Sequence, residues 1–277
     1  DGKKIIGYRE AMVLPDQPKS MIICGSGAIG SEFAYFYNSM GTKVTIVEFM
    51  PRTVPVEDED ISKELEKQFK KQGIAIMTSS EVTKVDTSGP GVKATVKTAQ
   101  GETVLEADIL LSAVGVVANI ENIGLEQLGI KTDKGKIIVD ANQQTNVPGI
   151  YAIGDVVKGA MLAHKAEEEG VALAEMLAGK AGHVNYNTVP GVIYTHPEIA
   201  SVGLSEEQAK KDEYWWDSVL GKIGYETERT KRTKHLDQKS GQKQDVVKQK
   251  EESLSLLKKE LISKLGGMSC SSRTKSC

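Results

Sequence analysis

Three glycines near the start of the chain have the spacing of a phosphate-binding loop. Gly25, Gly27 and Gly30 form a G-x-G-x-x-G pattern directly after a short apolar run. The first glycine would allow a tight turn, the second would let the backbone approach a pyrophosphate, and the third would let the next helix pack closely on the strand. The N-terminus of that helix would direct unpaired N–H groups at the phosphates, and the loop residues Ala28 and Ile29 are assigned to the same site. The pattern predicts a dinucleotide site, with a glycine-rich turn of an unrelated α/β protein as the alternative.

Two acidic residues near this loop could complete the site. Glu48 lies 18 residues beyond Gly30, at the end of the next predicted strand, where a carboxylate can accept hydrogen bonds from a ribose diol. Its charge would repel a 2′-phosphate, so the sequence favours NAD over NADP. Glu32, in the first helical turn, has two interpretations that the spacing leaves open. It is either a charge that stabilises the helix dipole or a carboxylate near the redox ring.

A second informative stretch covers residues 145–155 and ends in Gly154 and Asp155. A buried strand that ends this way places a carboxylate at the carboxyl edge of a sheet, where ligands bind. Such an acid can accept hydrogen bonds from sugar or ribityl hydroxyls. Taken alone, the same residues also describe a turn aspartate after a core strand.

The cysteine content indicates neither a disulfide framework nor a metal centre. The only cysteines are Cys24, Cys270 and Cys277, without a C-x-x-C pair or a Cys/His cluster. We therefore expect no structural zinc. A sparse, odd set suits a reducing compartment, taken as the cytoplasm, or the mitochondrial matrix or a plastid in a eukaryote.

The elements that must position these residues alternate between strands and helices. Apolar runs predict strands over residues 21–24, 43–48, 74–77 and 107–115, and period-2 patterns predict an antiparallel hairpin over 81–86 and 92–98. Helices are predicted over residues 31–40 and 60–72, with these residues on their buried faces: Phe33, Ala34, Tyr37, Met40, Ile61, Leu65 and Phe69. Strand, glycine turn, helix and parallel strand make a βαβ unit. The fold class is therefore α/β, with a Rossmann-like parallel sheet.

The rest of the chain changes character twice. From about residue 119, strands are predicted over residues 137–139 and 149–155, a helix over 162–177, and a strand-turn-strand over 188–203. From residue 212 to 277 the chain is rich in charge, and an amphipathic helix is predicted over residues 251–265.

Length and charge exclude several classes of protein. The chain has 277 residues, which suggests about two domains. A net charge of −3 offers no overall electrostatic case for nucleic acid. The sequence contains no apolar run of the roughly 18–20 residues that cross a bilayer.

Several motifs together resemble one family, the pyridine nucleotide–disulfide oxidoreductases, with the dihydrolipoamide dehydrogenases as the closest branch. The matching segments occur in the family's order within residues 1–211, and they are residues 25–32, 44–52, 57–73, 112–125, 145–155, 161–166 and 189–204.

The resemblance implies an α/β fold in which an NAD-binding domain interrupts an FAD-binding domain, followed by an α+β dimerisation domain. It divides the chain into a lead-in (1–19), an NAD domain (20–118), a partial FAD domain (119–187), the start of the dimerisation domain (188–211) and a divergent charged tail (212–277). It assigns Gly115 to the NAD site. It also assigns Gly154, Asp155, Met161, Leu162, Ala163 and His164 to the flavin site.

The resemblance also implies a reaction and partners. Electrons would pass from dihydrolipoamide through a cysteine pair and FAD to NAD, with a homodimer serving a lipoyl-bearing protein of a 2-oxo acid dehydrogenase complex. The family's cysteine pair, its first FAD half and its C-terminal His-Glu pair are not found in this sequence, and no residue here is assigned a catalytic role. We therefore expect this chain alone to be unable to reduce NAD with dihydrolipoamide. The alternative is a non-catalytic NAD-binding or interaction protein.

Overall fold

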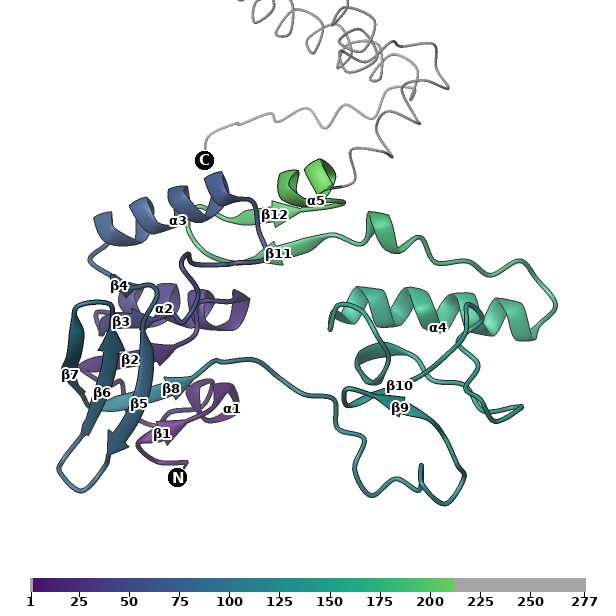
Figure 1. Ribbon diagram of the computed structural model, residues 1–277, viewed down its shortest axis with the longest axis horizontal. Coiled ribbons are helices and arrows are strands. Elements are labelled where there is room, and N and C mark those ends of the chain that lie inside the picture. Colours follow the sequence, from purple (N-terminus) through teal and green to yellow (C-terminus); the bar gives the residue numbers. More distant parts are fainter. Residues whose placement is uncertain (1, 212–277) are drawn as a thin grey trace, which may run out of the picture. The chain divides into compact units, whose positions relative to one another are not determined.

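The computed structural model describes residues 2–211, drawn in colour in Figure 1. The tail predicted to carry a helix over residues 251–265 lies outside the described residues. The described strands are β1 (Ile5–Ile6), β2 (Ser20–Cys24), β3 (Lys43–Val47), β4 (Ala75–Met77), β5 (Glu81–Asp86), β6 (Val92–Thr98), β7 (Gly101–Ala107), β8 (Ile109–Ser112), β9 (Thr132–Asp133), β10 (Lys136–Ile137), β11 (Gly191–Ile193) and β12 (Ile199–Ser201). The helices are α1 (Tyr8–Ala11), α2 (Ala28–Ser39), α3 (Glu59–Lys71), α4 (Ala163–Leu177) and α5 (Glu206–Lys211), with short 3-10 turns η1 (Gly154–Val156) and η2 (Tyr186–Thr188).

The central sheet has the strand order β1-β8-β2-β3-β4, and all its neighbouring strands are parallel. Cys24, the last residue of β2, is in register with Val47 on one side and Ser112 on the other. The carboxyl ends of β2, β3 and β8 therefore lie together at one edge. From β2 the chain continues to β3 and β4 on one side, and it later returns to β8 on the other side of β2. The order of the strands thus reverses between β2 and β8. In open α/β sheets such a reversal marks the place where ligands bind.

The two faces of β2 explain why its sequence is apolar throughout. Met21 and Ile23 belong to the core that includes residues of α2 and α3, whereas Ile22 and Cys24 belong to the core that includes β6. The second face is covered by the antiparallel sheet β5-β6-β7, which lies in front of the parallel sheet in Figure 1. Because both faces of the sheet are covered, the side chains from Met21 to Cys24 are buried whichever face they point to. The predicted hairpin over residues 81–98 is confirmed as β5 and β6, and β7 extends it.

Three predicted details of the parallel sheet and its helices are wrong. Helix α2 begins at Ala28, three residues before the predicted start. Met40 is 57% exposed because it is the C-cap of α2, where the helix ends. Ile61 is 40% exposed, and Ser62 takes its place in the buried row with Leu65 and Phe69. Ile61 and Ser62 lie four and three residues before Leu65, and both distances fit one helical stripe. Periodicity therefore could not decide which of the two faces inward.

Two strands predicted after residue 119, over residues 137–139 and 149–155, are largely absent. Residues 149–155 form one isolated bridge, between Tyr151 and Gln144, and then the turn η1. The predicted strand over residues 137–139 is reduced to β10, which pairs with β9. A strand requires neighbours that complete its hydrogen-bond ladder, and the described part of the chain supplies residues 150–153 with a single such bridge. The predicted strand over residues 107–115 is likewise shortened to β8.

The hairpin of β11 and β12 packs on the parallel-sheet unit, by which we mean the sheet β1-β8-β2-β3-β4 with helices α2 and α3. Ile193 and Ile199 are buried in the same core as β2, α2 and α3, and the Tyr194 N–H donates to Oε1 of Glu32 at 2.9 Å. This confirms the predicted strand-turn-strand and connects it to Glu32 on α2. Within residues 2–211, no helix has the length and hydropathy to span a membrane.

Candidate functional site

A cavity of about 680 Å³ lies at the carboxyl edge of the parallel sheet. Its walls come from the segments that follow β2, β3, β4 and β8. The lining residues are Cys24, Gly25, Gly27, Val47, Glu48, Phe49, Met50, Pro55, Val56, Ser80, Glu81, Val82, Ser112, Ala113, Val114 and Gly115. The cavity thus brings together four of the sequence-predicted residues: Gly25, Gly27, Glu48 and Gly115.

Two of the glycines are required by the backbone itself. Gly25 has a φ of +98°, and a Cβ there would lie 2.5 Å from the carbonyl oxygen of Ala113. A Cβ on Gly30 would lie 2.0 Å from the carbonyl oxygen of Gly25. These contacts are with backbone atoms, which cannot move aside as a flexible side chain can. Gly25 and Gly30 therefore allow the turn between β2 and α2 to be as tight as it is.

Gly27 has a different environment. A Cβ built on it meets no atom within 4 Å, although the residue lines the cavity. Gly27 is also the N-cap of α2 and offers no side-chain cap, with Ala28 and Ile29 following in the first turn. The space beside Gly27 and the uncapped N-terminus of a 12-residue helix together suit a bound anion.

Glu48 is buried, with 6% of its surface exposed, yet it lines the cavity. Its Oε2 accepts hydrogen bonds from both the backbone N–H and the hydroxyl of Ser26, each at 2.7 Å, and its Oε1 accepts from the N–H of Met50 at 2.7 Å. The carboxylate is thus held between the glycine loop and the end of β3. A carboxylate has about four acceptor positions, so one of them, on Oε1, has no protein donor among the described residues.

Glu32 does not line this cavity. Its carboxylate accepts a hydrogen bond from the backbone of Tyr194, so its position is linked to the β11–β12 hairpin. The sequence predicted that Glu32 lies in the first helical turn, and this is wrong: α2 begins at Ala28, so Glu32 is beyond its first turn.

Several cavity residues carry no sequence signal of their own. Met50, Val56, Ser80 and Val114 follow the ends of strands, Val82 lies in β5, and all five reach the cavity only through the fold. Phe49, Met50, Val56 and Val114 are also well exposed. An apolar residue just after a strand is common in any α/β protein, so only the shared sheet edge could have suggested these positions.

Cys24 lies at the end of β2 as a buried thiol that also lines the cavity. Burial raises its pKa from the ordinary 9.0 to about 11. Since the thiolate is the reactive form, about one Cys24 thiol in a thousand is ionised at pH 8.

We expect alkylation of Cys24 in the folded chain to keep accelerating from pH 9 to pH 10, because its pKa is about 11. Iodoacetamide labelling followed by peptide mass spectrometry measures the alkylation rate of this residue separately. In urea the alkylation rate of the same peptide should approach a plateau above pH 9, and a plateau near pH 9 in the folded chain would contradict the prediction.

The raised pKa of Cys24 also affects stability. Between pH 9 and pH 11 the folded state keeps a proton that the unfolded state releases, so the contribution of this thiol to the free energy of unfolding falls as the pH rises.

A second candidate region surrounds the first turns of α4. Asp155 is exposed, Met161 and Leu162 are half-buried, and Ala163 and His164 are exposed. Leu162 caps α4 without a side-chain hydrogen bond, and the ring of His164 is bonded through Nε2 to the carbonyl of Pro190 at 2.8 Å. The exposed carboxylate and the uncapped helix N-terminus are suitable groups for a ribityl chain, although the described residues do not enclose them.

The position of Asp155 depends on a buried ion pair next to it. Lys165 and Glu169, one helical turn apart on α4, are 1% and 0% exposed, with 3.1 Å between Nζ and Oε1. Nζ of Lys165 donates to the carbonyl of Gly154 at 2.9 Å, and Oε2 of Glu169 accepts from the Gly154 N–H at 2.6 Å. The pair therefore holds both backbone polar groups of the residue that precedes Asp155.

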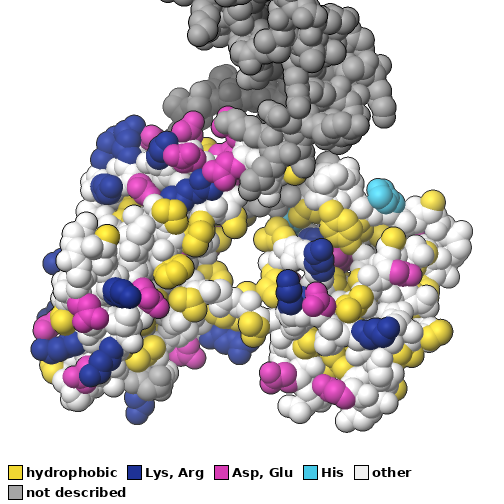
Figure 2. Space-filling model, in the orientation of Figure 1, with side chains coloured by type: hydrophobic (Ala, Val, Ile, Leu, Met, Phe, Trp, Pro, Cys, Tyr) yellow, Lys and Arg dark blue, Asp and Glu magenta, His cyan; other side chains and the backbone are white. Residues whose placement is uncertain are grey.

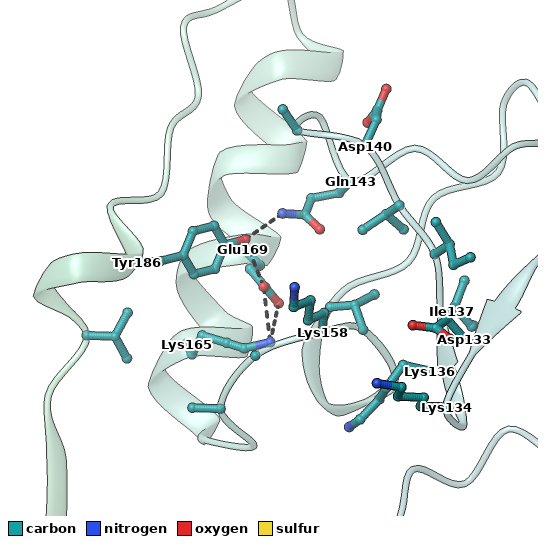
Figure 3. Close-up of a pocket in the computed structure, with 17 residues that line it drawn as sticks. Asp133, Lys134, Lys136, Ile137, Asp140, Gln143, Lys158, Lys165, Glu169 and Tyr186 are labelled. Atoms are coloured by element: carbon teal, nitrogen blue, oxygen red, sulfur yellow. Dashed lines mark hydrogen bonds and ion pairs between the residues drawn. The ribbon is translucent and has the colours of Figure 1, made fainter. Parts of the chain in front are cut away.

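Figure 3 shows how this ion pair continues into a hydrogen-bonded chain. The hydroxyl of Tyr186 donates to Oε1 of Glu169 at 2.9 Å and accepts from Nε2 of Gln143 at 2.7 Å. Burial and the adjacent Glu169 carboxylate raise the pKa of Tyr186. These residues line a cavity of about 780 Å³ that is bounded by apolar side chains of residues 137–139 and by Val157. Asp155 and residues 161–164 do not line it.

Other kinds of site have little support in residues 2–211. The described residues contain no group of three or more His, Cys, Asp or Glu side chains placed to hold a metal ion. On the face shown in Figure 2, basic and acidic side chains are interspersed over the described residues. That face does not present the continuous basic surface that nucleic-acid binding requires.

Family models and known proteins match most of this chain. The sequence model described as pyridine nucleotide-disulphide oxidoreductase matches residues 1–170, and the model of that family's dimerisation domain matches residues 189–251. The chain is 47% identical over 215 residues to dihydrolipoyl dehydrogenase 1, mitochondrial, of Arabidopsis thaliana, covering 76% of this chain and 42% of that protein. It is 51% identical over 214 residues to dihydrolipoyl dehydrogenase of Rhizobium etli, covering 76% and 44%.

A solved structure has the same fold. LpdA from Mycobacterium tuberculosis superimposes with a TM-score of 0.68 at 32% identity, over 75% of this chain and 45% of that chain. The chain therefore spans less than half the length of the curated relatives described above.

Proposed function

Because this chain belongs to the pyridine nucleotide–disulfide oxidoreductase family, we propose that its parallel-sheet unit binds NAD(H) as part of a dihydrolipoamide dehydrogenase. The family uses FAD and NAD(H), and its members transfer electrons between a disulfide and a nicotinamide coenzyme. The observation that carries the proposal is the open space at Gly27, which lies beside an uncapped helix N-terminus and a buried acid.

The residues fit the nucleotide in two respects. The pyrophosphate would lie beside Gly27, against the N–H groups of Ala28 and Ile29, where the helix N-terminus favours negative charge. A ribose hydroxyl would donate to the remaining acceptor position on Oε1 of Glu48. The buried carboxylate disfavours a 2′-phosphate at the same place, which supports NAD over NADP.

In this proposal Gly25 and Gly30 keep the loop compact and Gly115 lines the site, while Glu32, outside the cavity, is proposed as the carboxylate near the redox ring. The bound nucleotide supplies the hydride-accepting ring, while the residues of the chain position it and supply the electrostatic environment. Gly154, Asp155, Met161, Leu162, Ala163 and His164 are proposed as flavin contacts. The domain boundaries given above, at residues 20–118, 119–187 and 188–211, belong to the same proposal.

The wider activity also belongs to the proposal. Transfer from dihydrolipoamide to NAD, a homodimer and a lipoyl-bearing partner are supported by the similarity to dihydrolipoyl dehydrogenases and by the dimerisation-domain match. The relatives include mitochondrial and bacterial proteins, and we propose a cytoplasmic or mitochondrial-matrix location. A non-catalytic binding protein is not favoured, because the similar proteins bear the names of enzymes.

The test is a titration of the whole chain with NADH, in parallel with a Gly27→Ala variant. Gly27 has a φ of −64° and free space around its Cβ position, so alanine should leave the unfolding midpoint unchanged. Its methyl group would nevertheless occupy the position proposed for the pyrophosphate, and we expect NADH affinity to fall at least about tenfold, roughly 1.4 kcal/mol.

Fluorescence of bound NADH and thermal unfolding measure the two quantities separately. Exposed Gly135 (φ +73°), remote from the loop in the sequence, offers a matched comparison if it is changed to asparagine, which tolerates this conformation. Absence of NADH binding by the parent chain, or unchanged affinity in Gly27→Ala, would refute the proposed site.

A further inference from the structure

Ser26, between the first two glycines of the loop, is completely buried, and each of its polar groups has a partner. Its N–H and its hydroxyl both donate to Oε2 of Glu48. Its carbonyl accepts from the hydroxyl of Ser31 at 3.0 Å and from the N–H of Val54 at 3.1 Å. The side chain of Ser26 is therefore directed at the acid of the proposed site.

These contacts make the two oxygens of Glu48 unequal. Oε2 receives two donors from Ser26, and this fills its acceptor positions. Oε1 receives one donor, the N–H of Met50, and retains one position. The carboxylate can then accept from a single ribose hydroxyl instead of bonding both hydroxyls of the diol equally.

We propose that Ser26 is a positioning residue for nucleotide selection, an inference that rests on the proposed NAD site. Its hydroxyl holds the Glu48 carboxylate so that Oε1 faces one ribose hydroxyl, and in this way it contributes to the preference for a dinucleotide without a 2′-phosphate. Without the hydroxyl, only one hydrogen bond, from the Ser26 N–H, would hold Oε2 in place. Hydrogen bonds to a carboxylate are stronger than those between neutral groups, so loss of this one should loosen the carboxylate, which would keep only the N–H groups of Ser26 and Met50 as donors.

The experiment measures NADH and NADPH dissociation constants of the full chain at one ionic strength, for the parent, Ser26→Ala and Ser31→Ala. Ser31 is an equally buried serine whose hydroxyl bonds the same loop but has no hydrogen bond to Glu48. We expect Ser26→Ala to lower the preference for NADH over NADPH by roughly threefold to tenfold, the size of one weakened hydrogen bond. Ser31→Ala should leave the ratio unchanged even where it lowers thermal stability.

Two further variants separate positioning from a merely structural role. In a Glu48→Ala background, Ser26→Ala should have no additional effect on the ratio, because its effect passes through Glu48. Ser26→Cys keeps the side-chain size with a weaker donor and should give an intermediate ratio, which also covers the case in which Ser26→Ala fails to fold.

The possible outcomes distinguish the two proposals. A parent chain that binds neither nucleotide overturns the NAD site itself, and the inference with it. A parent that prefers NADH, while Ser26→Ala changes the ratio no more than Ser31→Ala does, overturns the role of Ser26 alone. An effect of Ser26→Ala that persists undiminished without Glu48 also overturns that role.

Discussion

Replacing Glu169 by alanine is expected to lower the free energy of unfolding of the region around α4 by about 3–5 kcal/mol. The substitution leaves the ammonium group of Lys165 buried without its counter-charge, and removes the acceptor of the Gly154 N–H and of the Tyr186 hydroxyl. A buried charge without a partner is among the few mechanisms that destabilise a protein this strongly. The turn that carries Asp155 should lose its fixed position at the same time.

Hydrogen exchange of the α4 amides, followed against urea concentration, measures this effect locally. Glu168→Ala provides the matched control, because Glu168 is the exposed neighbour on the same helix, and its loss should change stability by less than about 0.5 kcal/mol. The double variant Lys165→Met/Glu169→Leu should recover part of the loss, since an apolar pair carries no desolvation cost. Recovery should be incomplete because the Gly154 N–H keeps no acceptor, although its carbonyl still accepts from the Val157 N–H. Equal protection of α4 in Glu169→Ala and Glu168→Ala would contradict the role of the ion pair.

Replacing Gly30 by alanine is expected to destabilise the parallel-sheet unit by about 3 kcal/mol or more and to abolish NADH binding. The added Cβ would lie 2.0 Å from the carbonyl oxygen of Gly25 and 3.0 Å from its carbonyl carbon. Relief of this contact requires α2 to move away from β2, and that movement would displace the glycine loop and expose the Ala34 side of the helix.

Urea unfolding of the whole chain and NADH titration together test this prediction. Gly27→Ala is the informative comparison, because it lies in the same loop and should weaken binding without affecting stability. If Gly30→Ala unfolds at the parental urea concentration, the close packing of α2 on β2 is not required. Together, the two variants distinguish a glycine needed by the protein backbone from a glycine needed by the ligand.

Local patterns were most reliable where the chain itself determines the structure. The order of β2, loop, α2 and β3 follows from an apolar run, three glycines and a second apolar run, and each element lies near its predicted place. The hairpin of β5 and β6 and the helix α4 were also predicted, because period-2 alternation and a long helical pattern reflect neighbouring residues alone. The lead-in supplies β1, which pairs with β8. This strand has two residues, and a run of that length is too short to show the alternation that identifies a strand in a sequence.

Predictions failed where a segment's structure depends on distant parts of the chain. Residues 149–155 have the apolar sequence of a strand, but strand formation depends on neighbours that accept and donate hydrogen bonds across the ladder. The buried partners Lys165 and Glu169 could not be distinguished from an ordinary surface i,i+4 pair, because their spacing is the same in both cases. Burial and hydrogen bonds with Gly154 and Tyr186, which lie outside the helix, make the difference.

The sequence by itself determined the fold class and the identity of the loop, because glycine spacing and strand hydrophobicity are local properties. It also identified Glu48 as the acid after the second strand, since the strand length places that residue at the sheet edge. Only the tertiary structure decided that Ser26 occupies Oε2 of this acid, that Gly27 faces open space, and that Val82 and Val114 share the cavity. Such relations depend on the register of β8, β2, β3 and β4, which pairs residues as far apart in the chain as Cys24 and Ser112, and on the packing of α2.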